Sequence, residues 1–332
     1  MNHPSPARRL RLAWLVAALT LIAACDSTPG TTDRASLPPL ASLPATTSSV
    51  AATSTSSTST STTSTTSTTS PPTTTITTVA ATAAPTAVDP NQPPSIDAGA
   101  YAVYDVGSQQ WLAVLEADSA RPVGSLMKLL TAYVVMQAGD PAHVATVPAM
   151  QLDPAESAIG LYEGQRLSRA VLLRAELIVS ANDAAHTLAI DVGGTEEAFV
   201  GMMNDAAQTL GMTQTVAVNA VGLDADGAHS SARDMVSIAA ILMQDPTFQA
   251  TVARTEAQMN GQHFSATNKL LTRYEGATGV KTGHTTNAGY CLVGSATRGD
   301  RSVIVAVLGA PSDQARIDGA SALLDWAFDH SA

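Results

Sequence analysis

The chain has 332 residues, a formal net charge of −11 and a composition that is 45% hydrophobic but only 4% aromatic. Almost all of its acidic residues follow residue 95, and no run of Lys or Arg occurs there. This excess of negative charge argues against nucleic acid as a partner, although it says little about a small peptide substrate.

Residues 1–25 have the composition of a secretory signal peptide. Three arginines precede an apolar run at residues 12–24, which is too short to span a bilayer as a stable helix. The run leads through small residues to Cys25 and there resembles a bacterial lipobox, in which the cysteine becomes a lipidated N-terminus. This resemblance implies a lipid-anchored, extracytoplasmic protein that faces the cell wall. An ordinary signal peptide followed by a chance cysteine is the alternative.

Residues 26–95 are predicted to form a disordered linker. They contain no Phe, Trp, Tyr or Lys, and Ser, Thr, Pro and Ala dominate. Such a segment cannot bury enough apolar surface to offset the entropy lost on folding. The sequence therefore predicts a single folded domain over residues 96–332, a length that supports one sizeable core.

The folded part contains all three lysines of the chain, Lys128, Lys269 and Lys281, whereas the other fourteen cations are arginines. A buried lysine can lose its proton and act as a base, which a guanidinium effectively cannot do. Lysine, and not arginine, is therefore expected at positions where the chemistry needs a cation that can lose its proton. Two of the three lysines fall in motifs of catalytic type.

The first motif is Ser125-Leu-Met-Lys128, preceded by Gly124 and followed by an apolar run typical of a helix. Residues three apart on a helix share a face, so Lys128 can reach the Ser125 hydroxyl. A serine is a weak nucleophile until a base removes its proton, and a desolvated lysine can do so. Alone, this spacing is more often a solvated surface pair.

The second motif is Ser180-Ala-Asn182, between two segments with helical periodicity. Ser and Asn at such a junction would also serve as plain helix caps.

The third motif is Lys281-Thr282-Gly283. Two strand-like segments follow at residues 289–296 and 302–308, with a turn between them, which predicts a meander of antiparallel strands. A glycine beside a strand-edge lysine permits close approach of an extended substrate, and the lysine charge suits a terminal carboxylate.

The three motifs in this order resemble the signature of the penicillin-binding proteins and serine β-lactamases. Over residues 96–330 the chain resembles, more narrowly, the low-molecular-mass D-alanyl-D-alanine carboxypeptidases, serine peptidases that release the terminal D-alanine of peptidoglycan stem peptides. The resemblance implies an α+β fold with an antiparallel sheet flanked by helices and an all-helical subdomain. It also implies that residues 96–332 are the catalytic domain and that β-lactams are inhibitors.

The resemblance assigns roles to the first two motifs. Ser125 would be the nucleophile and Lys128 the general base for acylation. Ser180 would relay a proton to the departing D-alanine, and Asn182 would hold Lys128 and the substrate amide.

The third motif would bind the end of the substrate. The resemblance implies that Lys281 and Thr282 bind the terminal carboxylate. Gly283 and His284, which follow them, would also belong to the substrate-binding site. The backbone N–H groups of Ser125 and His284 would form the oxyanion hole. No cluster of His, Cys, Asp and Glu has the spacing of metal ligands, so neither a metal nor a cofactor is expected.

Three alternatives stay open. A class A β-lactamase would share the fold, but such enzymes carry Asp where Ala181 stands and use a deacylating glutamate between the second and third motifs, which is not matched here. A D,D-endopeptidase that cuts cross-links is not separated from a carboxypeptidase by sequence. A non-catalytic wall-binding lipoprotein would retain the fold, and the intact motifs argue against it.

Overall fold

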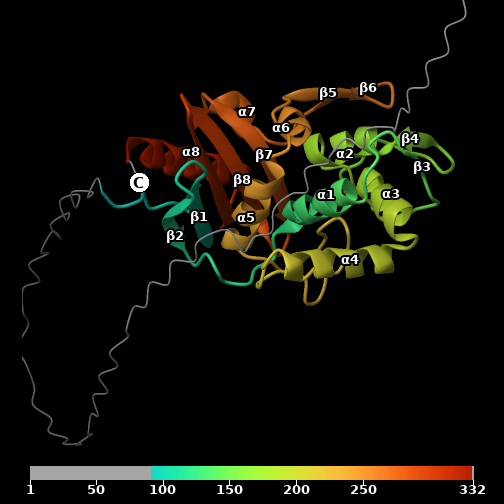
Figure 1. Ribbon diagram of the computed structural model, residues 1–332, viewed down its shortest axis with the longest axis horizontal. Helices are drawn as coiled ribbons and strands as arrows, with labels where there is room; N and C mark the ends of the chain where they lie inside the picture. The colour runs from blue at the N-terminus through green and yellow to red at the C-terminus, as the bar shows by residue number, and fades with distance from the viewer. Residues whose placement is uncertain (1–90, 331–332) are drawn as a thin grey trace, which may run out of the picture. The chain divides into compact units, whose positions relative to one another are not determined.

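A five-stranded antiparallel sheet forms the centre of residues 91–330, which are the residues that this computed structural model describes. Its strand order is β2-β1-β9-β8-β7, so that β7 and β2 are the two edge strands (Figure 1). The strands are β1 (Ala100–Asp105), β2 (Gln110–Leu115), β7 (Ala277–Thr285), β8 (Gly289–Arg298) and β9 (Arg301–Ala310). The predicted meander is therefore confirmed.

Both faces of this sheet are covered, which explains why its central strands read as continuous apolar runs. On one face, Val303, Val305 and Val307 of β9 pack with α8 (Asp313–Asp329). On the other, Ile304 and Ala306 belong to a second cluster that includes α5 (Ala232–Leu242) and α1 (Lys128–Gln137). The result is a sheet between helical layers, as the resemblance implied.

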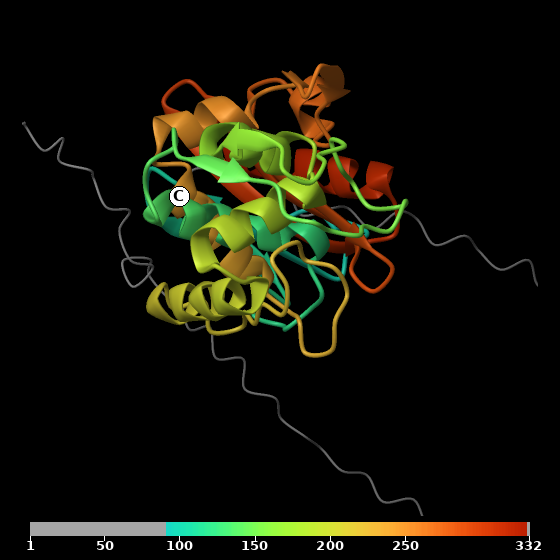
Figure 2. The same ribbon diagram turned by 90° about the vertical axis from the view of Figure 1, so that its right-hand side faces the viewer.

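A helical region lies beyond one side of the sheet, where Figure 2 shows its green and yellow helices toward the viewer. It consists of α1, α2 (Arg169–Ile178), α3 (Asn182–Gly193) and α4 (Glu196–Thr209). Side chains cap two of these helices: Ser168 accepts a hydrogen bond from Val171 N–H, and Thr195 accepts one from Ala198 N–H. The predicted all-helical subdomain is confirmed.

Short elements complete the described part of the chain. They are β3 (Val144–Thr146) paired with β4 (Arg166–Ser168), β5 (Glu256–Met259) paired with β6 (Gln262–Ser265), α6 (Pro246–Val252), α7 (Leu270–Arg273) and the 3₁₀ helix η2 (Gly124–Met127). Within residues 91–330, no helix combines the length and the apolar character needed to cross a membrane. The predicted signal peptide, Cys25 and nearly all of the linker lie outside the described residues.

Candidate active site

The serine of the first motif lies in η2, at the start of the helix α1. Gly124 precedes it with a φ of +56°, a conformation that L side chains rarely adopt, and Ser125 follows. Lys128 is the first residue of α1, and its Nζ lies 3.0 Å from the Ser125 Oγ. The turn therefore brings the hydroxyl and the amine together as the sequence predicted.

Lys128 is completely buried, with a relative exposure of 0%. Its Nζ donates to Asn182 Oδ1 at 2.7 Å and to the Val221 carbonyl at 2.6 Å. Burial lowers the pKa of Lys128 to about 7, and the charges of Glu176 and Glu156 only partly oppose this effect. The neutral amine is thus accessible near neutral pH, where it can accept a proton from Ser125.

The second motif occupies the bend between α2 and α3. Ser180 has a φ of +66°, and its Oγ accepts a hydrogen bond of 2.9 Å from Lys281 Nζ. Asn182 binds Lys128 through Oδ1 and donates from Nδ2 to Glu156 at 2.5 Å. The alternative of plain helix caps is wrong for these two residues, because α3 begins after Ala181 without a side-chain cap.

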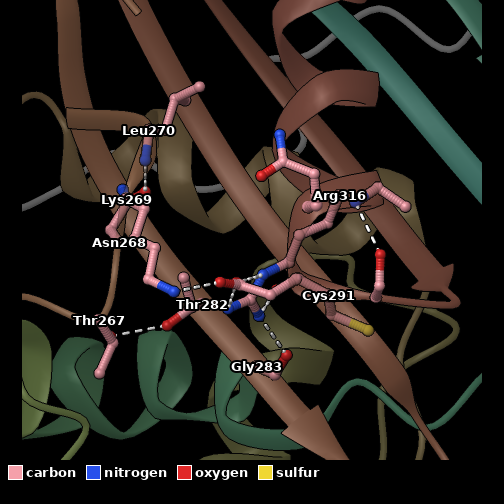
Figure 3. A network of polar contacts seen from close by, with 12 residues as sticks. Thr267, Asn268, Lys269, Leu270, Thr282, Gly283, Cys291 and Arg316 are labelled. Atoms are coloured by element: carbon pink, nitrogen blue, oxygen red, sulfur yellow. Dashed lines mark hydrogen bonds and ion pairs between the residues drawn. The ribbon is translucent and has the colours of Figure 1, made fainter. Parts of the chain in front are cut away.

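The third motif lies on the edge strand β7. Lys281 is 1% exposed, and burial together with the nearby charge of Lys128 holds the pKa of its amine well below the usual range. Besides Ser180, its Nζ binds the Thr282 carbonyl at 2.8 Å. The Thr282 hydroxyl donates to the Thr267 hydroxyl at 2.7 Å, a contact visible in Figure 3.

Glycine permits the first and third motifs to meet. A Cβ at Gly124 would lie 2.9 Å from the backbone nitrogen of His284. A Cβ at Gly283 would collide with the Val123 carbonyl oxygen and lie 3.1 Å from the Leu126 nitrogen. Since these contacts involve backbone atoms that cannot give way, both positions require glycine.

A cavity of about 490 Å³ opens over this arrangement. All three motifs contribute to its lining, which consists of Ser125, Asp153, Ala155, Glu156, Ser157, Ser180, Asn182, Leu223, Thr267, Thr282, Gly283, His284 and Arg316. Lys128 and Lys281 are not part of this lining, but they bind the hydroxyls of two of its residues, Ser125 and Ser180, respectively. Every predicted catalytic or substrate-binding residue within the described part of the chain therefore belongs to one site.

Three charged residues of the site were not identified from the sequence. Glu156 comes from the loop between β3 and β4, where no local pattern marks it. Glu176 is fully buried in the last turn of α2, and a signal was available, because a charge interrupts an apolar helix end just before the second motif. Arg316 comes from α8, more than thirty residues after the third motif.

Arg316 anchors the third motif from behind. Its guanidinium donates to the carbonyls of Gly283 at 2.8 Å and Cys291 at 2.9 Å, as Figure 3 shows. Asp313 accepts from the same guanidinium at 2.9 Å and orients it. Among residues 91–330, no group of three or more His, Cys, Asp or Glu side chains could hold a metal ion.

The profile of the D-alanyl-D-alanine carboxypeptidase family, Peptidase_S11, matches residues 86–312 of the chain. The chain belongs to this family. It is 38% identical over 251 residues to the D-alanyl-D-alanine carboxypeptidase DacC of Escherichia coli, an alignment that covers 71% of this chain and 62% of DacC. The chain thus aligns with less than two thirds of the length of this relative.

Solved structures of the family agree with the fold. The D-alanyl-D-alanine carboxypeptidase of Mycobacterium tuberculosis superimposes with a TM-score of 0.68 and 33% identity, covering 72% of this chain and 94% of that structure. The Streptomyces K15 DD-transpeptidase superimposes with a TM-score of 0.66 and 30% identity, covering 72% of this chain and all of that structure. The predicted fold class is therefore confirmed.

Proposed function

We propose that this chain is a serine D,D-carboxypeptidase that releases the terminal D-alanine from peptidoglycan stem peptides through an acyl-enzyme on Ser125. The observation that carries the proposal is the 3.0 Å contact between the Lys128 Nζ and the Ser125 Oγ, made by a buried amine whose pKa is lowered to about 7. A surface lysine would stay charged at neutral pH and could not serve as the base.

In the proposed acylation, Ser125 Oγ attacks the carbonyl carbon of the penultimate D-alanine while Lys128 accepts the hydroxyl proton. The N–H groups of Ser125 and His284 stabilise the oxyanion of the tetrahedral intermediate. The C–N bond then breaks, Ser180 passes its proton to the amine of the departing D-alanine, and the proton held by Lys128 replaces the one that Ser180 has lost. Water hydrolyses the resulting ester and restores the free hydroxyl.

The substrate is proposed to be held at its carboxylate end by Lys281 and Thr282, with Asn182 against its amide. Lys281 places its amine against Ser180 of the cavity lining, and Arg316 places a cation in the same lining. A bound carboxylate would favour the protonated form of that amine. A carboxylate placed there would also form charge-assisted hydrogen bonds. The printed names of the relatives, D-alanyl-D-alanine carboxypeptidases, support this class of substrate.

The test is D-alanine release from an acylated Lys-D-Ala-D-Ala peptide by the full chain, with Ser125→Ala alongside. Release that disappears in the variant supports the proposal. If cross-linked peptide dimers are cut and the free peptide is not, the activity is instead that of a D,D-endopeptidase. If neither substrate is cut, a non-catalytic wall-binding role replaces the carboxypeptidase.

β-Lactams are proposed to acylate Ser125 and to leave slowly, as inhibitors. Glu156 deserves a direct test here, because it lines the cavity with Ser125 although it precedes the second motif in sequence. Nitrocefin hydrolysis by the full chain and by Glu156→Gln provides that test. Fast, repeated turnover that depends on Glu156 would make the protein a β-lactamase and contradict slow release.

We further propose that residues 96–332 form the catalytic domain, tethered by the linker of residues 26–95 to a membrane lipid on Cys25. The supporting observations are the apolar run that ends in Cys25 and the Ser/Thr/Pro-rich composition that follows. This arrangement would place the enzyme outside the cytoplasm, facing the cell wall.

A further inference from the structure

Two oxygen atoms hold the amine of Lys128 beside the Ser125 hydroxyl. The amine donates to the Asn182 Oδ1 at 2.7 Å and to the Val221 carbonyl at 2.6 Å, and it lies 3.0 Å from the Ser125 Oγ. A neutral amine has two N–H groups and one lone pair. When the two oxygens take the N–H groups, the lone pair is left facing the hydroxyl whose proton it must accept.

The two oxygens differ in how they are fixed. The Val221 carbonyl belongs to the backbone of a loop that Asn219 closes, because the Asn219 Oδ1 accepts from the N–H groups of residues 221–223 at 2.7 to 3.2 Å. The Asn182 oxygen belongs to a side-chain amide, which can turn over and exchange Oδ1 for Nδ2. Only the second oxygen therefore needs a partner that selects its orientation.

A reversed Asn182 amide would disable the base. Its Nδ2 would then face the Lys128 amine and could donate to the lone pair of the neutral form. The lone pair would no longer be free to accept the proton of Ser125. Acylation of Ser125 thus requires that the amide be held in one of its two orientations.

Glu156 holds the amide from the side opposite Lys128. Its Oε2 accepts from the Asn182 Nδ2 at 2.5 Å, and its Oε1 accepts from the Asp153 N–H at 3.0 Å. A carboxylate can only accept hydrogen bonds, so a reversed amide would set its own oxygen against the Glu156 oxygen. The loop that carries Glu156 is also fastened to the start of α3, where the Asn182 N–H donates to the Ser157 carbonyl at 2.7 Å.

We propose that Glu156 is a positioning residue, which fixes the orientation of the Asn182 amide and thereby aims the lone pair of Lys128 at Ser125. The inference rests on the proposed acylation of Ser125 with Lys128 as the base. Glu156 lies in the cavity lining, but in this role it acts through Asn182. Since Asn182 is only 4% exposed, water has little access to its amide and is a poor substitute for the carboxylate.

The first test measures the second-order rate constant for acylation of Ser125 by a fluorescent penicillin, in the full chain. Glu156→Ala is expected to slow acylation about tenfold, because the Asn182 amide is then free to reverse. Glu163→Ala is the matched control, since Glu163 is an exposed acid of the same loop between β3 and β4. Its rate should equal that of the wild type. An unchanged rate in Glu156→Ala, or an equal loss in both variants, would overturn the proposal.

A double-mutant cycle with Asn182→Ala shows whether Glu156 acts through Asn182. A residue that acts only through this amide has no effect once the amide is absent. Adding Glu156→Ala to Asn182→Ala is therefore expected to change the acylation rate by less than about twofold. A further tenfold loss would show that Glu156 acts directly on the penicillin, on the charge of Lys128 or on the fold, and the proposal would be wrong.

Glu156→Gln keeps the length of the side chain and replaces the alanine variant in this cycle if urea unfolding shows that Glu156→Ala does not fold. The glutamine oxygen can accept from Asn182, but the glutamine nitrogen can equally donate to a reversed Asn182. A loss of about two- to fivefold is expected with Asn182 present, and none in the Asn182→Ala background. No loss with Asn182 present, or the same loss in both backgrounds, would overturn the proposal.

Failure of this inference is distinct from failure of the proposed function. A wild-type chain that penicillin does not label would contradict the proposed acylation of Ser125 itself. A wild-type chain that is labelled, with independent effects of Glu156 and Asn182, would contradict only the positioning role.

Discussion

Lys128 shows how burial converts an ordinary side chain into a candidate base. The same residue type is exposed at Lys269, where it pairs with Asp313 at 2.6 Å, and buried at Lys128, where burial lowers the pKa of the amine to about 7. The difference in environment, and not in residue type, gives one of them its proposed chemistry.

Lys128→Arg is expected to slow acylation of Ser125 by about 10²–10⁴-fold, because a guanidinium cannot give up its proton to become the base. The measurement is the rate of covalent labelling by a fluorescent penicillin at pH 7. Lys269→Arg is the control, since an exposed arginine can keep the ion pair with Asp313, and its labelling rate should be unchanged. Rapid labelling of Lys128→Arg would show that another group serves as the base.

Most individual residues of the candidate site could be predicted from the sequence. The scarcity of lysine pointed to Lys128 and Lys281, and motif spacing brought in Ser125 and Ser180. Glu156 and Arg316 could not be predicted in the same way, because each reaches the cavity only through long-range packing of a loop or a helix. Glu176 was predictable in principle, as a charge within an apolar helix turn.

Among the elements, η2 and β7 approach each other so closely that their contact leaves no room for side chains at two positions. Gly283 of β7 lies against the backbone of η2, and Gly124 of η2 lies against the backbone of His284. The two segments are far apart in the sequence, so a side chain at either position would separate the proposed nucleophile from the proposed carboxylate-binding residues.

Gly283→Ala is expected to abolish most acylation and to lower stability by about 1–3 kcal/mol, because the new methyl group would meet the Val123 carbonyl. Penicillin labelling and urea unfolding measure the two effects. Gly201→Ala is the control: a Cβ there meets nothing within 4 Å in α4, so stability should rise by about 0.5–1 kcal/mol. Wild-type labelling by Gly283→Ala would contradict the close contact.

For the elements themselves, periodicity and turn residues were sufficient. The apolar strands 289–296 and 302–308 were predicted with the correct turn between them, and the structure extends them to β8 and β9. Taken alone, the sequence around Ser180 favours plain helix caps over a catalytic loop. In the structure, Lys281 binds Ser180 and Lys128 binds Asn182, so this junction is joined to the other two motifs.

For the whole molecule, the main feature is the contrast between residues 26–95, which lack aromatic residues and lysine, and the folded part that follows. Composition alone predicts this division, and nearly all of residues 26–95 lie outside the described residues. The sheet order β2-β1-β9-β8-β7 was not predictable from local pattern, because it joins the first strands of the domain to the last.

Cys25→Ala is expected to abolish incorporation of labelled palmitate and to move the chain from the membrane fraction to the soluble fraction. Lipid labelling and cell fractionation in a bacterial host measure both effects. Cys291→Ala removes the other cysteine, which is buried in β8, and should leave labelling unchanged. Persistent labelling of Cys25→Ala would disprove the proposed anchor.

The edge position of β7 has a consequence for the breadth of substrates. An edge strand offers backbone N–H and C=O groups to an extended peptide, and contacts of that kind are the same for every side chain. A stem peptide that aligns along β7 would be recognised by its backbone and its terminal carboxylate. Variation in the residues further from the cleaved bond should then be tolerated, so that one enzyme can trim walls of differing peptide composition.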